Sequence, residues 1–302
     1  MSFLSALGDP ILPIFAILAF GYVIGRAGKF DLAAARTLNW FAMTVLVPIA
    51  VFNLLAHAPL SELSGRALLI YSGMQAALFA LGYQLSRRLF GIGPAEAVLL
   101  AYAGIFANTF FYTLPISRLL FGPDQILPVT TVVVLDSTVS FAGVMIVLQV
   151  LNQGSASPMS ILRIFARTPA LLAIFAGMML AMVGIGLPGA VETFLDFNGV
   201  AAAPVALFAL GVILSGTRFT LDGAVASVVA IKLLALPAVV AWGLWLGGVP
   251  ESDARVFTFA AAGPAGAMAL SLSVLHGVPS DRVAQVLVWT SLLTLLTLAA
   301  LA

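Results

Sequence analysis

Residues 104–117 read GIFANTFFYTLPIS, which places an asparagine, a proline, a glycine and several hydroxyl side chains inside a long apolar segment. Proline removes a backbone hydrogen bond from a helix, and a freed backbone group in hydrocarbon costs several kcal/mol unless protein or water binds it. The stretch therefore predicts a membrane helix that is interrupted where it faces a polar interior rather than lipid.

The composition around this stretch is that of a membrane protein. Of 302 residues, 62% are hydrophobic and 8% are charged, whereas soluble domains average roughly 25% charged residues. Apolar runs long enough to cross a hydrocarbon core of ~30 Å recur along the whole chain. We therefore predict an all-α polytopic membrane protein with lipid around it. The net charge of +1 gives no reason to expect nucleic acid, and a chain without cysteine has no Cys-type zinc site.

Ten membrane spans are predicted, at residues 9–27, 33–57, 65–89, 95–120, 125–151, 161–183, 189–215, 221–247, 253–276 and 281–301. The first positive charge is Arg26, so we expect the first run to be a span and not a cleaved signal peptide. With both termini outside, most basic residues fall in the inside connections, as the positive-inside rule requires. The expected location is the plasma membrane, or the inner membrane of a bacterium.

The two halves of the chain, residues 1–152 and 160–302, match each other at a fixed offset of 156 residues. The matching pairs are Pro13 and Pro169, Gly21 and Gly177, Gly28 and Gly184, Pro48 and Pro204, Phe52 and Phe208, Gly91 and Gly247, Pro94 and Pro250, and Ser117 and Ser273. Each half holds five predicted spans. Because five is odd, the second half enters the membrane from the opposite side, which predicts two inverted repeats of the kind found in secondary transporters.

At the same offset, the interruption in span 4 corresponds to AAAGPAGAMALS, residues 260–271, in span 9. Two broken helices at corresponding positions of two halves point to a substrate site between them. The half-helices that follow the breaks present free N–H groups and the positive end of a dipole, which favours an anion.

Three short motifs resemble the auxin efflux carrier family: ANTFFYTLPISRLLFG (107–122), LVPIAVFNLLA (46–56) and IKLLALP (231–237). The resemblance covers essentially the whole chain and includes the layout of ten spans. It implies an architecture like that of sodium/proton antiporters or bile-acid symporters. Broken helices 4 and 9 would cross in a transport domain of spans 3–5 and 8–10. Spans 1, 2, 6 and 7 would form a scaffold domain that often dimerises.

The resemblance also implies a small organic anion as substrate, either an auxin-like carboxylate or a dicarboxylate, carried by elevator-type alternating access. No enzymatic activity and no cofactor are expected. The candidate substrate-binding residues are Asn108, Thr109, Pro115, Gly263, Pro264, Ala265, Gly266 and, from the second-span motif, Asn53.

One acid and one cation lie deep inside predicted spans, Asp136 and Lys232. Charges at that depth are costly and are usually paired or functional. We predict that Asp136 carries a proton or supports the site through hydrogen bonds, and that Lys232 balances charge or pairs with Asp136. Lys232 could instead extend its long side chain to the membrane surface. Gln75 and Ser140 are interpreted as hydrogen-bonding groups between helices.

Two other classes of function remain open. A cation–proton antiporter of the same architecture would use Asp136, although such proteins typically place two acids on this span. A passive channel or a sensor is a further alternative. A membrane enzyme is disfavoured because the chain has neither an HExxH metal motif nor a GxSxG nucleophile motif.

Overall fold

A computed structural model describes residues 12–59, 62–122, 125–153, 158–217 and 219–301. Within these ranges the chain is helical, apart from one isolated β-bridge. Six helices of the described part of the chain are long and apolar enough to cross a membrane: Leu32–Ala56, Gly65–Leu89, Leu127–Leu151, Gly189–Ser215, Gly223–Leu246 and Asp281–Leu301. Shorter apolar helices span Leu12–Arg26, Pro94–Ile105 and Pro169–Val183. The all-helical polytopic fold is confirmed, whereas the count of ten spans stays a prediction.

The chain divides into two compact units. Among the described residues, unit 1 lies within 64–156 and 217–301, and unit 2 lies within 12–63 and 157–216. Each unit therefore combines segments from both halves of the sequence.

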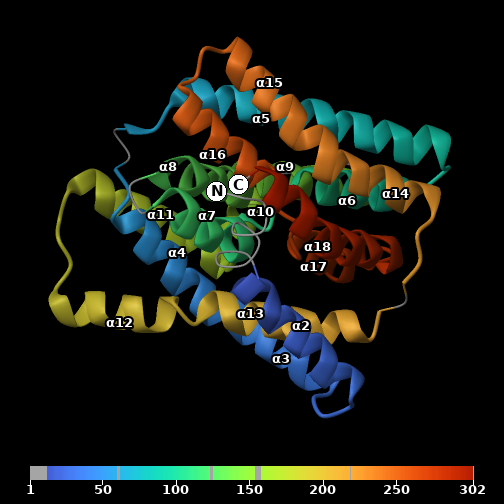
Figure 1. Cartoon of the computed structure of the whole chain (residues 1–302), viewed down its shortest axis with the longest axis horizontal. Coiled ribbons are helices and arrows are strands. Elements are labelled where there is room, and N and C mark those ends of the chain that lie inside the picture. Colours follow the sequence, from blue (N-terminus) through green and yellow to red (C-terminus); the bar gives the residue numbers. More distant parts are fainter. Residues whose placement is uncertain (1–11, 60–61, 123–124, 154–157, 218, 302) are drawn as a thin grey trace. The chain divides into compact units, whose positions relative to one another are not determined.

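Unit 2 consists of α2 (Leu12–Arg26), α3 (Leu32–Phe41), α4 (Val47–Ala56), α10 (Pro158–Arg167), α11 (Pro169–Val183), α12 (Gly189–Gly199) and α13 (Ala202–Ser215). Helix α2 runs along α13 (Figure 1), and α4 packs against α11. Glycines allow both close contacts: Gly21 of α2 meets the backbone of Phe208, and Gly177 of α11 meets the backbone of Phe52. These two contacts are related by the same offset of 156 residues that relates the halves of the sequence.

Unit 1 begins with α5 (Gly65–Gln84), α6 (Pro94–Ile105), α7 (Leu114–Phe121), α8 (Leu127–Leu135) and α9 (Phe141–Gln153). It continues with α14 (Gly223–Ala230), α15 (Leu236–Leu246), α16 (Glu251–Ala261), α17 (Met268–Leu275) and α18 (Asp281–Leu301). Helix α5 lies beside α15 (Figure 1) and packs against α6. Helices α6, α16 and α18 supply many of the buried side chains of this unit, which places these three helices in its core.

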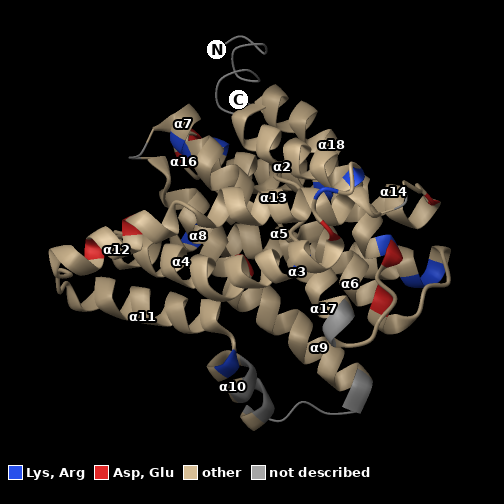
Figure 2. Cartoon of the chain, turned by 90° about the horizontal axis from the view of Figure 1, so that it is seen from below, with Lys and Arg blue, Asp and Glu red and all other residues tan. Residues whose placement is uncertain are grey.

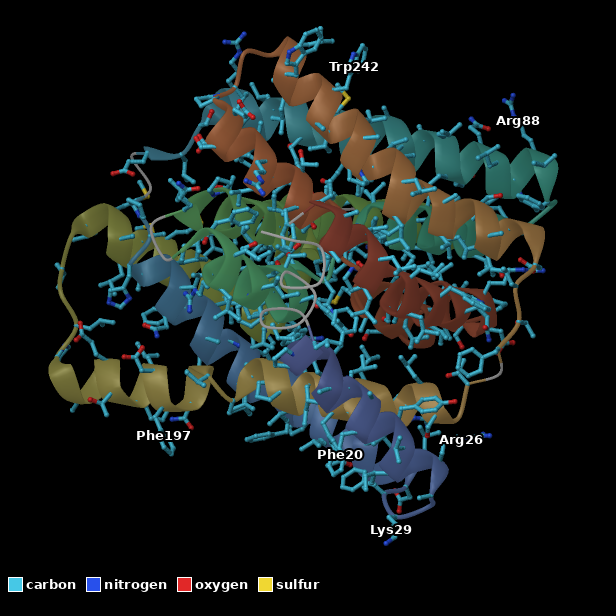
Figure 3. All side chains as sticks on the ribbon, in the orientation of Figure 1. Phe20, Arg26, Lys29, Arg88, Phe197 and Trp242 are labelled. Carbon is cyan, nitrogen blue, oxygen red and sulfur yellow. The ribbon has the colours of Figure 1, made fainter. Side chains whose placement is uncertain are left out.

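Large apolar side chains on the outside of each unit suit contact with lipid. Phe20 and Phe197 of unit 2 and Trp242 of unit 1 point outward (Figure 3), and they are 57%, 81% and 58% exposed. Charged positions are few in both units, and most of the ribbon carries none (Figure 2). This pattern is that of a protein whose solvent is largely hydrocarbon.

The described residues contain five wider, π-helical turns, and three of these turns end two residues before a proline. They are Ala42–Leu46 before Pro48, Thr109–Thr113 before Pro115, and Ile231–Ala235 before Pro237. A proline lacks the N–H that would bind the carbonyl four residues back, and its ring crowds that carbonyl. The wider turn accommodates this defect. The other two turns, Leu85–Leu89 and Asp136–Ser140, have no such proline.

Candidate functional site

The first interruption separates α6 from α7 in unit 1. Helix α6 ends at Ile105, Phe106 is extended (φ −77°, ψ 115°), and Asn108 also has a non-helical backbone (φ −76°, ψ 58°). A helical path then resumes at Thr109 as a π-helical turn and continues into α7, where Pro115 occupies the first turn. Because the path is already helical from Thr109, Pro115 lies inside it, and the π-helical turn before the proline accommodates the missing N–H.

The second interruption separates α16 from α17 in the same unit. Helix α16 ends at Ala261 and α17 begins at Met268, with the sequence Gly263-Pro264-Ala265-Gly266 between them. Proline prevents the residue before it from adopting helical geometry, and the glycines add backbone freedom. The second interruption therefore contains the proline and glycines that predicted it, whereas the first lies at residues 106–108, before Pro115.

The two interruptions cross and pair with each other through one isolated antiparallel β-bridge. The N–H of Asn108 donates to the carbonyl of Pro264 (2.8 Å), and the N–H of Gly266 donates to the carbonyl of Phe106 (3.1 Å). Ala107 and Ala265 form the bridge between them. Backbone groups that the helix breaks set free thus bind one another, which removes much of their cost inside a membrane.

The crossing leaves no room for side chains at two glycines. A Cβ atom added at Gly266 would overlap the ring of Phe106, and one added at Gly263 would press on Thr113. Close approach of the two segments therefore requires glycine at these positions, independently of backbone conformation.

Asp136 and Gln75 support the first interruption. The Asp136 side chain, 2% exposed, accepts hydrogen bonds from the Gln75 amide (2.7 Å) and from the N–H of Ala107 (3.4 Å). The same Gln75 amide donates to the carbonyl of Ile105 (3.2 Å), at the C-terminal end of α6. Ser140 adds longer bonds to Gln75 (3.3 Å) and to Asp136 (3.4 Å). The Asp136 carboxylate thus accepts from the N–H of Ala107, and the Gln75 amide donates to the carbonyl of Ile105. Both backbone groups were left without a helical partner by the break.

Lys232 and two threonines of α18 support the second interruption. The fully buried Lys232 ammonium donates to the carbonyl of Ala261 (2.6 Å), at the C-terminal end of α16. Thr294 donates to the carbonyl of Ala262 (2.9 Å), and the Thr290 hydroxyl accepts from the N–H of Ala265 (3.1 Å). Because Lys232 binds inside the protein, the alternative of a side chain that extends to the membrane surface is wrong.

Asp136 and Lys232 lie near each other without forming a direct ion pair within the described residues. Each binds a backbone group of a different interruption, and their opposite charges interact electrostatically through the interior. Asp136 begins one π-helical turn and Lys232 is the second residue of another. Such turns occur often at functional sites.

Asn108 is the polar side chain at the crossing that remains available to a ligand. It is 6% exposed, and its amide has no hydrogen-bond partner among the described residues. It immediately precedes the first helical turn, Thr109–Thr113, whose leading N–H groups point away from their own helix. An amide and several N–H donors at the positive end of a helix form a suitable environment for a carboxylate.

Asn53, which the second-span motif assigned to substrate, belongs to unit 2. Its amide donates to the Asp196 carboxylate of α12 (2.7 Å), and the neighbouring His57 lies 3.8 Å from Glu192. These contacts join α4 to α12 within the unit. Among the described residues, no group of three or more His, Asp or Glu side chains could hold a metal ion.

Sequence reasoning missed the two threonines, Thr290 and Thr294. They stand one helical turn apart on α18 and face the second interruption. Their spacing of four residues was the available signal, but hydroxyl side chains are common in membrane helices and carry little information alone.

A family model described as "Membrane transport protein" matches residues 7–158 and 155–302. A Rhizobium meliloti (strain 1021) protein named "Putative malonate transporter" is 25% identical over 96% of this chain and 93% of its own length. "Uncharacterized transporter YfdV" of Escherichia coli (strain K12) is 25% identical over 76% of each chain. An "Uncharacterized transporter" of Methanothermobacter thermautotrophicus is 23% identical over 96% of this chain and 95% of its own length.

Proposed function

Because the chain belongs to the membrane transport protein family, the auxin efflux carrier family that its motifs resemble, we propose that it is a secondary carrier of small organic anions. The family and the named relatives identify a membrane transporter and not an enzyme. Small carboxylates are the proposed substrates, either auxin-like or dicarboxylate. The name of the Rhizobium relative supports this class without identifying the member.

The observation that carries the proposal is the amide of Asn108, which has no hydrogen-bond partner among the described residues and lies at the crossing of two interrupted helices. A carboxylate that accepts hydrogen bonds from this amide and from the N–H groups after it would replace the water that otherwise solvates them. The proposed site comprises both breaks and the turns that follow: Asn108, Thr109, Pro115, Gly263, Pro264, Ala265 and Gly266.

We propose alternating access as the mechanism, with ten spans in two inverted repeats. The six long helices, the shorter α2 and α11, and the interrupted pairs α6–α7 and α16–α17 would supply these spans. The related contacts of Gly21 with Phe208 and of Gly177 with Phe52 support the repeat. Unit 1 would be the moving transport domain and unit 2 the scaffold, which would form a homodimer in the plasma membrane with both termini outside.

The test is a thermal-shift and exchange experiment on purified protein. A ligand that binds only the folded state raises thermal stability by mass action. We expect one class of carboxylate to stabilise the protein, and unlabelled substrate on the far side to accelerate exchange in proteoliposomes. Asn108→Ala should abolish both effects. The matched control is Asn198→Ala, because the amide of Asn198 binds the Phe194 carbonyl of its own helix.

Three outcomes would contradict parts of the proposal. Normal carboxylate binding by Asn108→Ala would move the site away from the crossing. Transport without acceleration by far-side substrate would indicate a channel. Stabilisation by sodium or lithium ions, and by no carboxylate, would favour the cation–proton antiporter that uses Asp136.

A further inference from the structure

Asp136 and Lys232 are the buried charged side chains in the described part of the chain. When both are ionised, they contribute opposite charges to the same interior, which is then neutral overall. Each is fixed to the crossing through a backbone group, Asp136 to the N–H of Ala107 and Lys232 to the carbonyl of Ala261. The charge of the empty site is therefore set by this one pair.

The other titratable side chains that face Asp136 do not change this balance. Besides Lys232, they are Tyr71 of α5 and Tyr102 of α6, both fully buried and neutral in their protonated form. The hydroxyls of Tyr71 and Tyr102 have no hydrogen-bond partner among the described residues. Buried polar groups without a protein partner commonly bind water. Such water beside Asp136 would give a proton a route to the carboxylate.

An anion that binds at Asn108 arrives next to Ala107, whose N–H the Asp136 carboxylate already holds. It therefore adds a second negative charge close to the first, in surroundings where charges are poorly screened. Protonation of Asp136 removes one of these charges and restores neutrality with Lys232. Anion binding and proton binding then favour each other, and linkage makes this effect reciprocal.

We propose that Asp136 binds a proton together with the anionic substrate, so that the protein carries protons in the number that cancels the charge of the anion. This inference rests on the proposed function of an anion carrier. The empty site, with ionised Asp136 and Lys232, and the loaded site, with neutral Asp136, Lys232 and one negative charge, are both neutral. Either form can change conformation without moving net charge across the membrane.

The test measures proton uptake on binding, with two acids of equal carbon number. Sodium propionate or sodium malonate is titrated at pH 7 into purified protein in weakly buffered detergent solution with a pH indicator. We expect about one proton taken up per propionate, on Asp136, and about two per malonate, one on Asp136 and one on the second carboxylate of malonate itself. Each complex is then neutral. The apparent affinity for propionate should rise up to about tenfold for each unit decrease in pH, the limit for one linked proton.

Asp136→Asn imitates the protonated carboxyl group and should reduce uptake by one proton for each acid, to about none for propionate and one for malonate. Its propionate affinity should no longer depend on pH. The matched control is Glu96→Gln, since Glu96 is an acid of α6 that binds Arg282 (2.9 Å) rather than the crossing. This variant should take up as many protons as the wild-type protein.

The wild-type titration decides the proposal even if Asp136→Asn does not fold. Binding of either acid without proton uptake would overturn this inference and leave the anion carrier intact. Unchanged uptake in a folded Asp136→Asn variant would also overturn it, because the proton would then bind elsewhere. Failure of the wild-type protein to bind any carboxylate would overturn the proposed function and this inference with it.

Discussion

The interruption around Asn108 is supported by a carboxylate and an amide, whereas the interruption around Pro264 is supported by an ammonium group and two hydroxyls. Both interruptions leave the same kinds of backbone group without a partner in their own helix. Each break leaves a carbonyl at the end of a helix, Ile105 or Ala261, and a free N–H, Ala107 or Ala265, and neighbouring helices supply a partner for each.

The correspondence extends to sequence position. Ile105 and Ala261 are 156 residues apart, and Lys232 lies 157 residues after Gln75, which is its counterpart in the first half. The two supports therefore occupy nearly equivalent places but carry different charges. Backbone geometry constrains where a donor must lie, and it leaves open whether the donor is neutral or charged. That freedom allows one site to contain a pair of opposite charges.

Replacing Lys232 by methionine tests the charged part of the comparison and should have the largest effect. The variant leaves the carbonyl of Ala261 without its donor and Asp136 without its opposite charge. Removal of one partner from a buried charge pair costs about 3–5 kcal/mol. Thermal unfolding in detergent should show a large decrease in stability. Lys29→Met, at an exposed position that points outward (Figure 3), is the control and should change little.

A double variant decides whether the two charges are coupled. Asp136→Asn combined with Lys232→Met should be more stable than Lys232→Met alone, because no uncompensated charge remains. If the stability losses of the two single variants simply add in the double variant, then Asp136 and Lys232 stabilise their interruptions independently of each other.

Replacing Gly266 by alanine tests the contact that both interruptions share. The new methyl group would overlap the ring of Phe106, so the segments must separate. Overpacking of this kind costs about 1–3 kcal/mol, and we also expect loss of carboxylate binding. A second substitution, Phe106→Leu, should restore part of both. Gly73→Ala is the control, because an added Cβ at Gly73 meets open space. Wild-type binding by Gly266→Ala would show that the crossing need not be closely packed.

Residue type made part of the site predictable from sequence. Pro264 and the glycines beside it mark a helix break, and Asp136 and Lys232 are conspicuous because charge is rare in this chain. The partners of these residues were not predictable, since Lys232 binds a carbonyl 29 positions away in the sequence and Asp136 an N–H at the same separation. Backbone partners leave no trace in side-chain identity. The π-helical turns before Pro48 and Pro237 were likewise not foreseen, although the prolines that accompany them were visible.

The threonines of α18 show most clearly what could not be predicted from the sequence. Besides its bond to Ala265, the Thr290 hydroxyl donates to the carbonyl of Val286 in its own helix (2.6 Å), as many hydroxyls in membrane helices do. From sequence, a threonine that binds only its own helix and one that also supports a crossing look the same. Only the packing of α18 against the crossing distinguishes them.

Thr290→Val tests the neutral part of the comparison and should have the smallest effect. The valine keeps the shape of the side chain and removes the acceptor for the N–H of Ala265. Hydrogen bonds between membrane helices contribute about 1 kcal/mol or less, because competing partners remain available. We expect a small decrease in thermal stability. Thr297→Val is the matched control, since the Thr297 hydroxyl binds Thr294 of its own helix.

The relative sizes of the stability losses in Thr290→Val and Lys232→Met separate the contribution of charge from that of hydrogen bonding. If the crossing needed only satisfied backbone groups, the two substitutions would cost similar amounts, because each removes one partner from the same interruption. A loss several times larger for Lys232→Met would mean that charge, and not hydrogen bonding, is what the ammonium group contributes. Equal losses would mean that the charge of Lys232 does not matter for stability, so that its pairing with Asp136 would have no energetic basis. Both interruptions would then need only hydrogen-bond partners for their free backbone groups.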